Sequence, residues 1–191
     1  MNAIELSHVT KHFPGFTLQD LSLTVPSGTI CGLVGENGAG KSTTIRLLMG
    51  ALRPDSGRCT VLGADSASPE FLSLKEDIGV VLDEAYFPES LNALQVGGVM
   101  AKTYRRWDGK QYQNYLTRFG LPEKKPFKDF SRGMKMKLAI AVALSHSPRL
   151  LVLDEATAGL DPIVRDEVLE IFNEFTREED HSILISSHIL S

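Results

Sequence analysis

The stretch GENGAGKST at residues 35–43 decides the fold. It fits the pattern G-x-x-x-x-G-K-[ST] and follows the short apolar run TICGLV at residues 29–34. Glycines permit backbone conformations in which successive N–H groups point inward at phosphate oxygens. A helix beginning at Lys41 would add the positive end of its dipole, the Lys41 ammonium a full charge, and the Ser42 hydroxyl a ligand for Mg²⁺. We therefore interpret this stretch as a phosphate-binding loop rather than an ordinary glycine-rich turn. The residues expected to contact the phosphates are Gly35, Glu36, Asn37, Gly38, Ala39, Gly40, Lys41, Ser42 and Thr43.

A second motif, LLVLDE at residues 150–155, ends in two carboxylates. A strand that ends in Asp154 presents its carboxylate at the edge of the sheet where the phosphate-binding loop lies, and there it can hold Mg²⁺ through water. Glu155 follows immediately, and a carboxylate at that place can polarise a water molecule for attack on a terminal phosphate. A solvated strand end is the ordinary alternative, and the presence of the loop favours the catalytic interpretation.

The N-terminal third has the pattern of a small β-layer. Residues 3–13 and 16–28 alternate apolar and polar side chains with turn residues between them, which predicts antiparallel strands. Residues 29–34 form a continuous apolar run, which predicts a buried strand. A helix over about 41–49 and a further strand over 58–63 follow.

Helical patterns dominate the middle of the chain. Over about residues 85–147 the sequence predicts helices and no strand. Asp108 can cap one of these helices and Ser131 another, because their short polar side chains can accept hydrogen bonds from the first turn. This middle part therefore reads as an insertion.

The α/β pattern resumes with a strand over residues 149–153. A helix opened by Asp161, with proline in its first turn, and a strand over 182–186 complete it. We predict an α/β fold in which residues 1–84 and 148–191 form a P-loop NTPase core. This core would have a mostly parallel sheet and an N-terminal antiparallel β-layer, with the inserted α-helical subdomain between the two parts.

Composition excludes several classes of protein. The chain has 191 residues and a formal charge of −4, which provides no field that would recruit a nucleic-acid backbone. The two cysteines, Cys31 and Cys59, lie inside apolar runs, and we expect small core residues there rather than a disulfide or a metal site. Since no apolar run approaches the roughly 18 residues needed to span a bilayer, we expect a cytoplasmic protein that reaches a membrane only through partners.

Several separated motifs, in order along the chain, carry a family resemblance. The phosphate-binding loop is followed by FSRGM at residues 130–134, by LLVLDE, by AGLD ending at Asp161, and by ISSHIL, which contains His188. In this respect the chain resembles the ATP-binding subunits of ABC transporters over nearly its whole length. Residues 130–134 lie where that family has its signature segment, usually leucine-serine-glycine-glycine-glutamine.

The resemblance implies that the nucleotide site is shared between two subunits. In this family the signature segment of one subunit closes on the ATP that the other subunit holds. Ser131, Arg132 and Gly133 would thus bind the partner's γ-phosphate at a helix N-terminus, and Asp161 would lie in the dimer contact. ATP would join the subunits and hydrolysis would release them, so that nucleotide cleavage becomes motion.

The resemblance also assigns roles to single residues. Glu155 is implied as the catalytic base, His188 as a contact to the γ-phosphate that also positions the attacking water, and Lys41 as a further catalytic residue. Phe13 lies where the family has an aromatic residue that stacks on adenine.

The chain departs from the family pattern at two places. Arg132 replaces the usual first glycine of the signature segment and Met134 replaces its glutamine, a variant similar to one in exporter-type members. In IGVVLDE we align Asp83 with the glutamine that touches Mg²⁺ and the attacking water, although Glu84 leaves the alignment open by one residue. An aspartate can still bind Mg²⁺, but an ionised carboxylate cannot donate a hydrogen bond.

The resemblance implies an Mg²⁺-dependent ATPase that works with a second ATP-binding subunit, identical or related, and with membrane-spanning permease subunits. It would lie peripherally on the inner face of the cell membrane and drive transport, with a lean towards export. Two other classes stay open. One is the soluble DNA-repair or ribosome-acting relatives, whose coiled coils and zinc insertions this sequence lacks. The other is a cassette that holds ATP without cleaving it.

Overall fold

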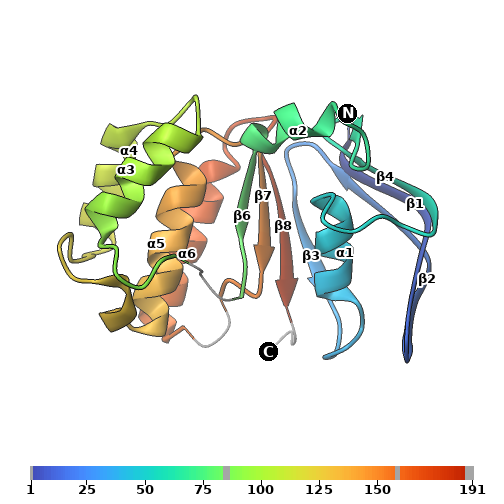
Figure 1. Cartoon of the computed structure of the whole chain (residues 1–191), viewed down its shortest axis with the longest axis horizontal. Coiled ribbons are helices and arrows are strands. Elements are labelled where there is room, and N and C mark those ends of the chain that lie inside the picture. Colours follow the sequence, from blue (N-terminus) through green and yellow to red (C-terminus); the bar gives the residue numbers. More distant parts are fainter. Residues whose placement is uncertain (1, 84–86, 158–159, 188–191) are drawn as a thin grey trace.

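The computed structural model describes residues 2–83, 87–157 and 160–187 (Figure 1). Its strands form two sheets, one antiparallel and one parallel. Helices pack against the parallel sheet, and α3, α4, α5 and α6 lie together on the left in Figure 1. The predicted α/β fold with a β-layer and an inserted helical region is confirmed, while the exact domain bounds stay a prediction.

The N-terminal β-layer is a four-stranded sheet in the order β2-β1-β4-β5. Its strands are β1 (Asn2–Phe13), β2 (Phe16–Pro26), β4 (Ser56–Val61) and β5 (Ala64–Asp65). All neighbours in it pair antiparallel, as the alternating sequence pattern predicts.

The second sheet has the order β3-β8-β7-β6, and all its pairs are parallel. Its strands are β3 (Ile30–Val34), β8 (Ser182–Ser187), β7 (Leu150–Asp154) and β6 (Ile78–Val81). The arrowheads of β6, β7 and β8 point to one edge of the sheet, at the bottom of Figure 1. Ligands of open parallel sheets bind at this carboxyl edge.

The prediction that β3 is a buried strand is wrong. Ile30 and Val34 expose 50% and 47% of their surface. β3 lies at the end of the parallel sheet, and none of its residues belongs to the core on the α5–α6 face, so its side chains on that face are uncovered. Its Cys31 and Leu33 still pack on the core shared with α1, whereas Ile30 and Val34 point to the opposite face.

The described residues form six α-helices, of which the last three begin at the caps that the sequence predicts. They are α1 (Lys41–Leu48), α2 (Phe71–Leu74), α3 (Ala93–Thr103), α4 (Gly109–Arg118), α5 (Arg132–Leu144) and α6 (Pro162–Phe175), with short 3₁₀ turns at Lys75–Asp77 and Phe127–Asp129. Asp108 accepts hydrogen bonds from Lys110 N and Gln111 N, both 2.9 Å, which begins α4 as predicted. Between residues 87 and 148 the described backbone contains helices and a single isolated bridge, Asn92–Pro126.

Two hydrophobic cores occupy the two faces of the parallel sheet. Leu151 and Leu153 of β7 belong to the core that contains α5 and α6, whereas Leu150 and Val152 belong to the core that contains α1 and the antiparallel sheet. All four side chains are at most 1% exposed. Because successive side chains of a strand alternate between faces, residue 154 points to the α1 side.

Both cysteines are free thiols; Cys59 is a buried core residue as predicted, whereas Cys31 is only half-buried. Burial raises the pKa of the Cys59 thiol to about 11, so this side chain stays a neutral core residue. Among the described residues no helix is both long and apolar enough to cross a membrane.

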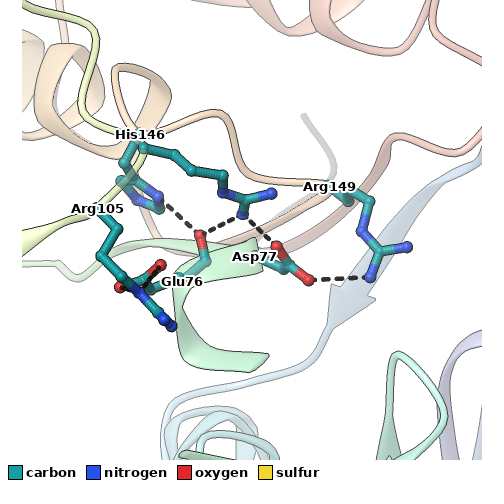
Figure 2. Close-up of polar contacts among 6 residues, drawn as sticks. Glu76, Asp77, Arg105, His146 and Arg149 are labelled. Atoms are coloured by element: carbon teal, nitrogen blue, oxygen red, sulfur yellow. Dashed lines mark hydrogen bonds and ion pairs between the residues drawn. The ribbon is translucent and has the colours of Figure 1, made fainter. Parts of the chain in front are cut away.

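A polar network joins the helical region to the start of β6 (Figure 2). His146 Nδ1 lies 3.0 Å from the Glu76 carbonyl, to which Arg106 also donates at 3.1 Å. Arg106 further pairs with Asp77, and Arg149 donates to the other oxygen of Asp77 at 2.9 Å. The network lies at the edge of the sheet opposite to the carboxyl edge, because β6 begins there.

Candidate phosphate-binding site

The phosphate-binding loop has the backbone that the sequence predicts. Gly38 and Gly40 have φ angles of 81° and 95°, in the left-handed region that favours glycine. A Cβ on Gly40 would lie 2.9 Å from Leu18 Cδ1 and 3.0 Å from Phe16 Cζ, so the position is also crowded. Gly40 caps α1 without any side-chain hydrogen bond. An anion at this end would therefore meet first-turn N–H groups that no capping side chain covers.

Lys41 holds the loop closed. Its side chain is largely buried, and Nζ donates to the carbonyl oxygens of Gly35 at 2.7 Å and Glu36 at 3.0 Å. A buried ammonium is stabilised by such hydrogen bonds, and a phosphate oxygen would be a stronger, charge-assisted partner.

A cavity of about 440 Å³ opens at the loop. This volume lies within the range of small-molecule sites. It is lined by Gly15, Phe16, Asn37, Gly38, Gly40, Lys41, Ser42, Thr43 and Glu155. Six of the nine predicted phosphate contacts are thus brought together with the predicted base Glu155. Gly35 and Glu36 instead serve as acceptors for Lys41, and Ala39 N donates to the Glu36 carbonyl at 3.1 Å.

Asp154 lies at the end of β7 and is 7% exposed. Ser186 of β8 lies beside it, with Oγ 2.6 Å from Asp154 Oδ1, and the same Oγ accepts the N–H of Glu155 at 3.0 Å. Glu155 itself has a φ of 54°, which is uncommon for a residue with a side chain. Ser186 belongs to none of the site residues that the sequence predicts. Its only signal was a polar residue at the end of a buried strand.

The donor set suits magnesium bound together with a nucleotide. The described residues contain no group of three His, Cys, Asp or Glu side chains that could enclose a metal ion. The Ser42 hydroxyl and the Asp154 carboxylate are hard oxygen donors, and magnesium is usually held by one or two protein ligands, water and phosphate oxygens.

A second group of predicted residues gathers at the starts of α5 and α6. Ser131 Oγ accepts the N–H of Met134 at 3.2 Å, and Asp161 Oδ1 accepts the N–H of Val164 at 3.1 Å, so both predicted caps are confirmed. A cavity of about 150 Å³ is lined by Phe119, Ser131, Gly133, Met134, Lys137, Leu160, Asp161 and Val164. None of these residues lines the cavity at the phosphate-binding loop. Within one molecule the signature segment and the loop thus line separate cavities.

The two departures from the family pattern lie next to each other. Arg132 Nη2 donates to Asp83 Oδ1 at 3.0 Å, and both side chains are about half exposed. Neither residue is among those that line the two cavities. Their predicted roles, Asp83 towards Mg²⁺ and Arg132 towards a partner's phosphate, stay predictions.

The aromatic residue at the cavity is Phe16, which the sequence analysis missed. Phe13 is 36% exposed, and its ring stacks on that of Phe16 with centroids 6.3 Å apart. The signal for Phe16 was available, because it follows the Gly15 turn and pairs with Phe13 across the hairpin. Phe13 stays a predicted adenine contact. His188 and Glu84 lie outside the described residues.

Comparisons with known proteins agree with this geometry. Residues 18–158 match the sequence model of the family described as ABC transporter. The ABC transporter ATP-binding protein YtrB of Bacillus subtilis is 32% identical over 98% of this chain and 64% of its own length. The bacitracin transport ATP-binding protein BcrA of Bacillus licheniformis is 38% identical over 98% of this chain and 62% of its own. The chain therefore spans less than two thirds of the length of these relatives.

The fold is also that of a solved structure described as the ATP-binding subunit of an ABC transporter. The two chains superpose with a TM-score of 0.85 at 27% identity, covering 98% of this chain and 80% of the other.

Proposed function

Because this chain belongs to the ABC transporter family of ATP-binding proteins, we propose that it binds ATP with Mg²⁺ and hydrolyses it to drive transport by membrane-spanning partner subunits. The observation that carries the proposal is the separation of the two cavities. The phosphate-binding loop lines one and the signature segment the other. One molecule therefore offers two incomplete halves of a site, and two molecules placed head to tail would complete both.

Each half contributes its own groups. The N-terminus of α1 and Lys41 bind the phosphates, and Ser42 with Asp154 would hold Mg²⁺, which neutralises charge on the terminal phosphates. The carboxylate of Glu155, at the same cavity, takes a proton from the attacking water. From the second molecule, Ser131 and the first N–H groups of α5 face the γ-phosphate.

Exposed groups at the starts of α5 and α6 support contact with a second ATP-binding subunit, identical or related. Ser131 and Asp161 are both exposed. Ile163, the second residue of α6, exposes 82% of its surface and adds an apolar group at the same end of that helix as Asp161.

Membrane-spanning permease subunits are the second kind of partner. The helical region between residues 87 and 147 would receive their cytoplasmic loops, which places the protein on the inner face of the cell membrane. We favour export, because the Ser131–Met134 variant resembles that of exporter-type members. A relative named for bacitracin transport is compatible with this direction. The transported compound is set by the permease subunits.

A cassette that binds ATP without cleaving it is the second candidate. The Asp83–Arg132 ion pair favours it, since it occupies a carboxylate that would otherwise be available to Mg²⁺.

The substitution Glu155→Gln tests the proposal. It removes the group that takes the proton and keeps the shape of the side chain. We expect phosphate release to cease, ATP binding to persist, and dimers to accumulate with ATP in size-exclusion chromatography with light scattering. Glu178→Gln, an exposed carboxylate away from the site, is the control and should leave turnover unchanged. Full turnover by Glu155→Gln would reject Glu155 as the base, and absence of turnover in the unmodified protein with its permease partners would favour the non-hydrolysing cassette.

A further inference from the structure

Ser186 contacts both of the acidic residues to which the proposed function gives a role, the side chain of Asp154 and the backbone of Glu155. Its side chain is 1% exposed, and its Oγ contacts both Asp154 Oδ1, at 2.6 Å, and Glu155 N, at 3.0 Å. A buried hydroxyl must satisfy its hydrogen bonds inside the protein, so this pair of contacts fixes its orientation.

The directions of the two hydrogen bonds follow by elimination. The Glu155 N–H can only donate, so Ser186 Oγ accepts from it. The hydroxyl proton is then left for Asp154 Oδ1, which accepts this second hydrogen bond. One oxygen of Asp154 is thereby held by the protein. Its other oxygen is the one that can turn to the shell of a metal ion.

The sheet explains why residue 186 can do this. β7 and β8 run parallel with Asp154 paired to Ser186, so both side chains project from the same face, towards α1. The preceding positions on this face, Val152 and Leu184, are apolar and fully buried. A serine here therefore does not follow from packing alone, since an apolar residue would continue the core.

Glu155 depends on the same hydroxyl. Its φ of 54° turns the chain sharply after β7, and such a conformation disfavours residues with a Cβ. The hydrogen bond from Glu155 N to Ser186 Oγ closes this turn onto the neighbouring strand. The direction in which the Glu155 side chain leaves the backbone is set by this turn.

We propose that Ser186 is a positioning residue for both carboxylates: its one hydroxyl orients Asp154 towards the metal ion and fixes the backbone turn that aims Glu155 at the cavity. This inference rests on the proposed function and names a part of its machinery. Partners in the outer shell of a metal site commonly account for about ten- to hundred-fold in metal affinity or activity.

The chain offers a matched control. Ser182, on the same face of the same strand, is also fully buried, and its Oγ accepts the N–H of Gly28 at 3.0 Å. Ser182→Ala therefore removes a buried hydroxyl from β8 at the end away from the carboxylates. Ser186→Ala removes the proposed positioning group, and Ser186→Thr retains a hydroxyl at the same place.

The first measurement needs no hydrolysis. Mn²⁺ is titrated into the full-length protein saturated with ADP and followed by electron paramagnetic resonance, while ADP affinity is measured separately in EDTA. We expect Ser186→Ala to weaken Mn²⁺ binding about ten-fold or more, with ADP affinity in EDTA unchanged. Ser186→Thr should restore Mn²⁺ binding and Ser182→Ala should leave it unchanged. Hydrogen exchange at the Glu155 amide should accelerate in Ser186→Ala.

Turnover is measured second, in the complex with its permease subunits. Ser186→Ala should lower kcat about ten- to hundred-fold with little change in KM for ATP, because phosphate binding by Lys41 is intact. Equal effects of Ser186→Ala and Ser182→Ala on Mn²⁺ binding would overturn the inference, since a loss of buried hydrogen bonding would then explain both. If the unmodified protein has no turnover, the proposed function fails, and the Mn²⁺ and exchange results still decide the role of Ser186.

Discussion

Arg132 Nη2 donates a hydrogen bond to Asp83 Oδ1 at 3.0 Å, so two of the residues that depart from the ABC pattern form an ion pair with each other. The pair joins the first residue of α5 to the segment after β6. The predicted roles of both side chains, towards Mg²⁺ and towards a partner's phosphate, would require the pair to open. We therefore expect the ion pair to form in the nucleotide-free subunit and to open when nucleotide is bound.

We predict that the energetic coupling between Arg132 and Asp83 depends on nucleotide. In a double-mutant cycle with Arg132→Ala and Asp83→Ala, urea unfolding without nucleotide should give a coupling of about 0.2–1 kcal/mol, because both side chains are about half exposed. When the same double-mutant cycle is repeated in a protein that also carries Glu155→Gln and forms the ATP-bound dimer, the coupling energy between Arg132 and Asp83 should be zero. An undiminished coupling there would mean that the two side chains stay paired and do not reach the nucleotide.

The phosphate-binding loop should tolerate no side chain at Gly40. Gly40→Ala imposes a φ of 95° on alanine and pushes Cβ against Leu18 and Phe16, which lines the cavity. Gly63→Ala, with a φ of 87° and no atom within 4 Å of its Cβ, measures the backbone cost alone, about 1–2 kcal/mol. We expect both to lower stability in thermal unfolding, and only Gly40→Ala to lower ATP affinity, by ten-fold or more in calorimetry. Unchanged ATP affinity in Gly40→Ala would contradict the assignment of the cavity.

If adenine stacks on Phe13, a substitution there should weaken binding of the base without affecting binding of the phosphates. Phe13→Ala should weaken ATP binding about five-fold or more, the equivalent of about 1 kcal/mol of stacking, and leave binding of inorganic tripolyphosphate unchanged. Competition against a fluorescent nucleotide measures both. If Phe13→Ala binds ATP normally while Phe16→Ala does not, the base stacks on Phe16 instead.

His146 should make the protein less stable in mild acid. Its Nδ1 faces the Glu76 carbonyl, which can only accept, so Nδ1 carries the proton of the neutral ring. Nε2 is buried without a hydrogen-bond partner among the described residues. The ring stacks on that of Tyr104, with the ring centroids 4.1 Å apart. Burial, with a smaller contribution from the positive charge of Arg106, lowers the pKa of His146 below its ordinary value, although the Glu76 carbonyl and carboxylate oppose this.

A lowered pKa in the folded protein means that the unfolded chain binds a proton first as the pH falls. Stability is therefore complete above the ordinary histidine pKa of about 6.5 and declines below it, until the lower pKa of the folded state is reached. We expect the unfolding free energy of His146→Gln to fall less than that of the unmodified protein between pH 7.5 and 5.5. Parallel pH profiles for the two proteins would contradict this account. Asp77, Arg105 and Arg149, which complete the surrounding network, are present in both (Figure 2).

The sequence predicted those structural features that depend only on residues close together in the chain, such as helix caps. Ser131 and Asp161 cap α5 and α6 because a cap needs only its own next three residues. The left-handed glycines of the loop are equally local. The exposure of β3 could not be read in this way, because it depends on a strand order that places β8, some 150 residues later, on one side only.

The parts of the site that were missed depend on pairing between distant segments. Ser186 matters because the register of β7 and β8 sets it against Asp154. Arg132 and Asp83 form an ion pair because the start of α5 lies next to the segment that follows β6. A sequence motif identifies the groups that carry the chemistry, whereas the residues that orient them are fixed by the sheet.

The most direct test of the shared site is a cross-link between the phosphate-binding loop of one molecule and the start of α5 in another. One protein carries Asn37→Cys, and a second protein, made larger by a tag, carries Arg132→Cys. Both also carry Glu155→Gln and Cys31→Ala. Both positions are exposed, and Cys59 is buried. The two proteins are mixed and treated with a short bis-maleimide, with and without MgATP.

We predict a cross-linked product that contains one chain of each kind and forms only with MgATP. A chain carrying both substitutions should cross-link to another molecule and not within itself. A cross-link within a single chain, or none between chains when MgATP is bound, would contradict a nucleotide held between two molecules.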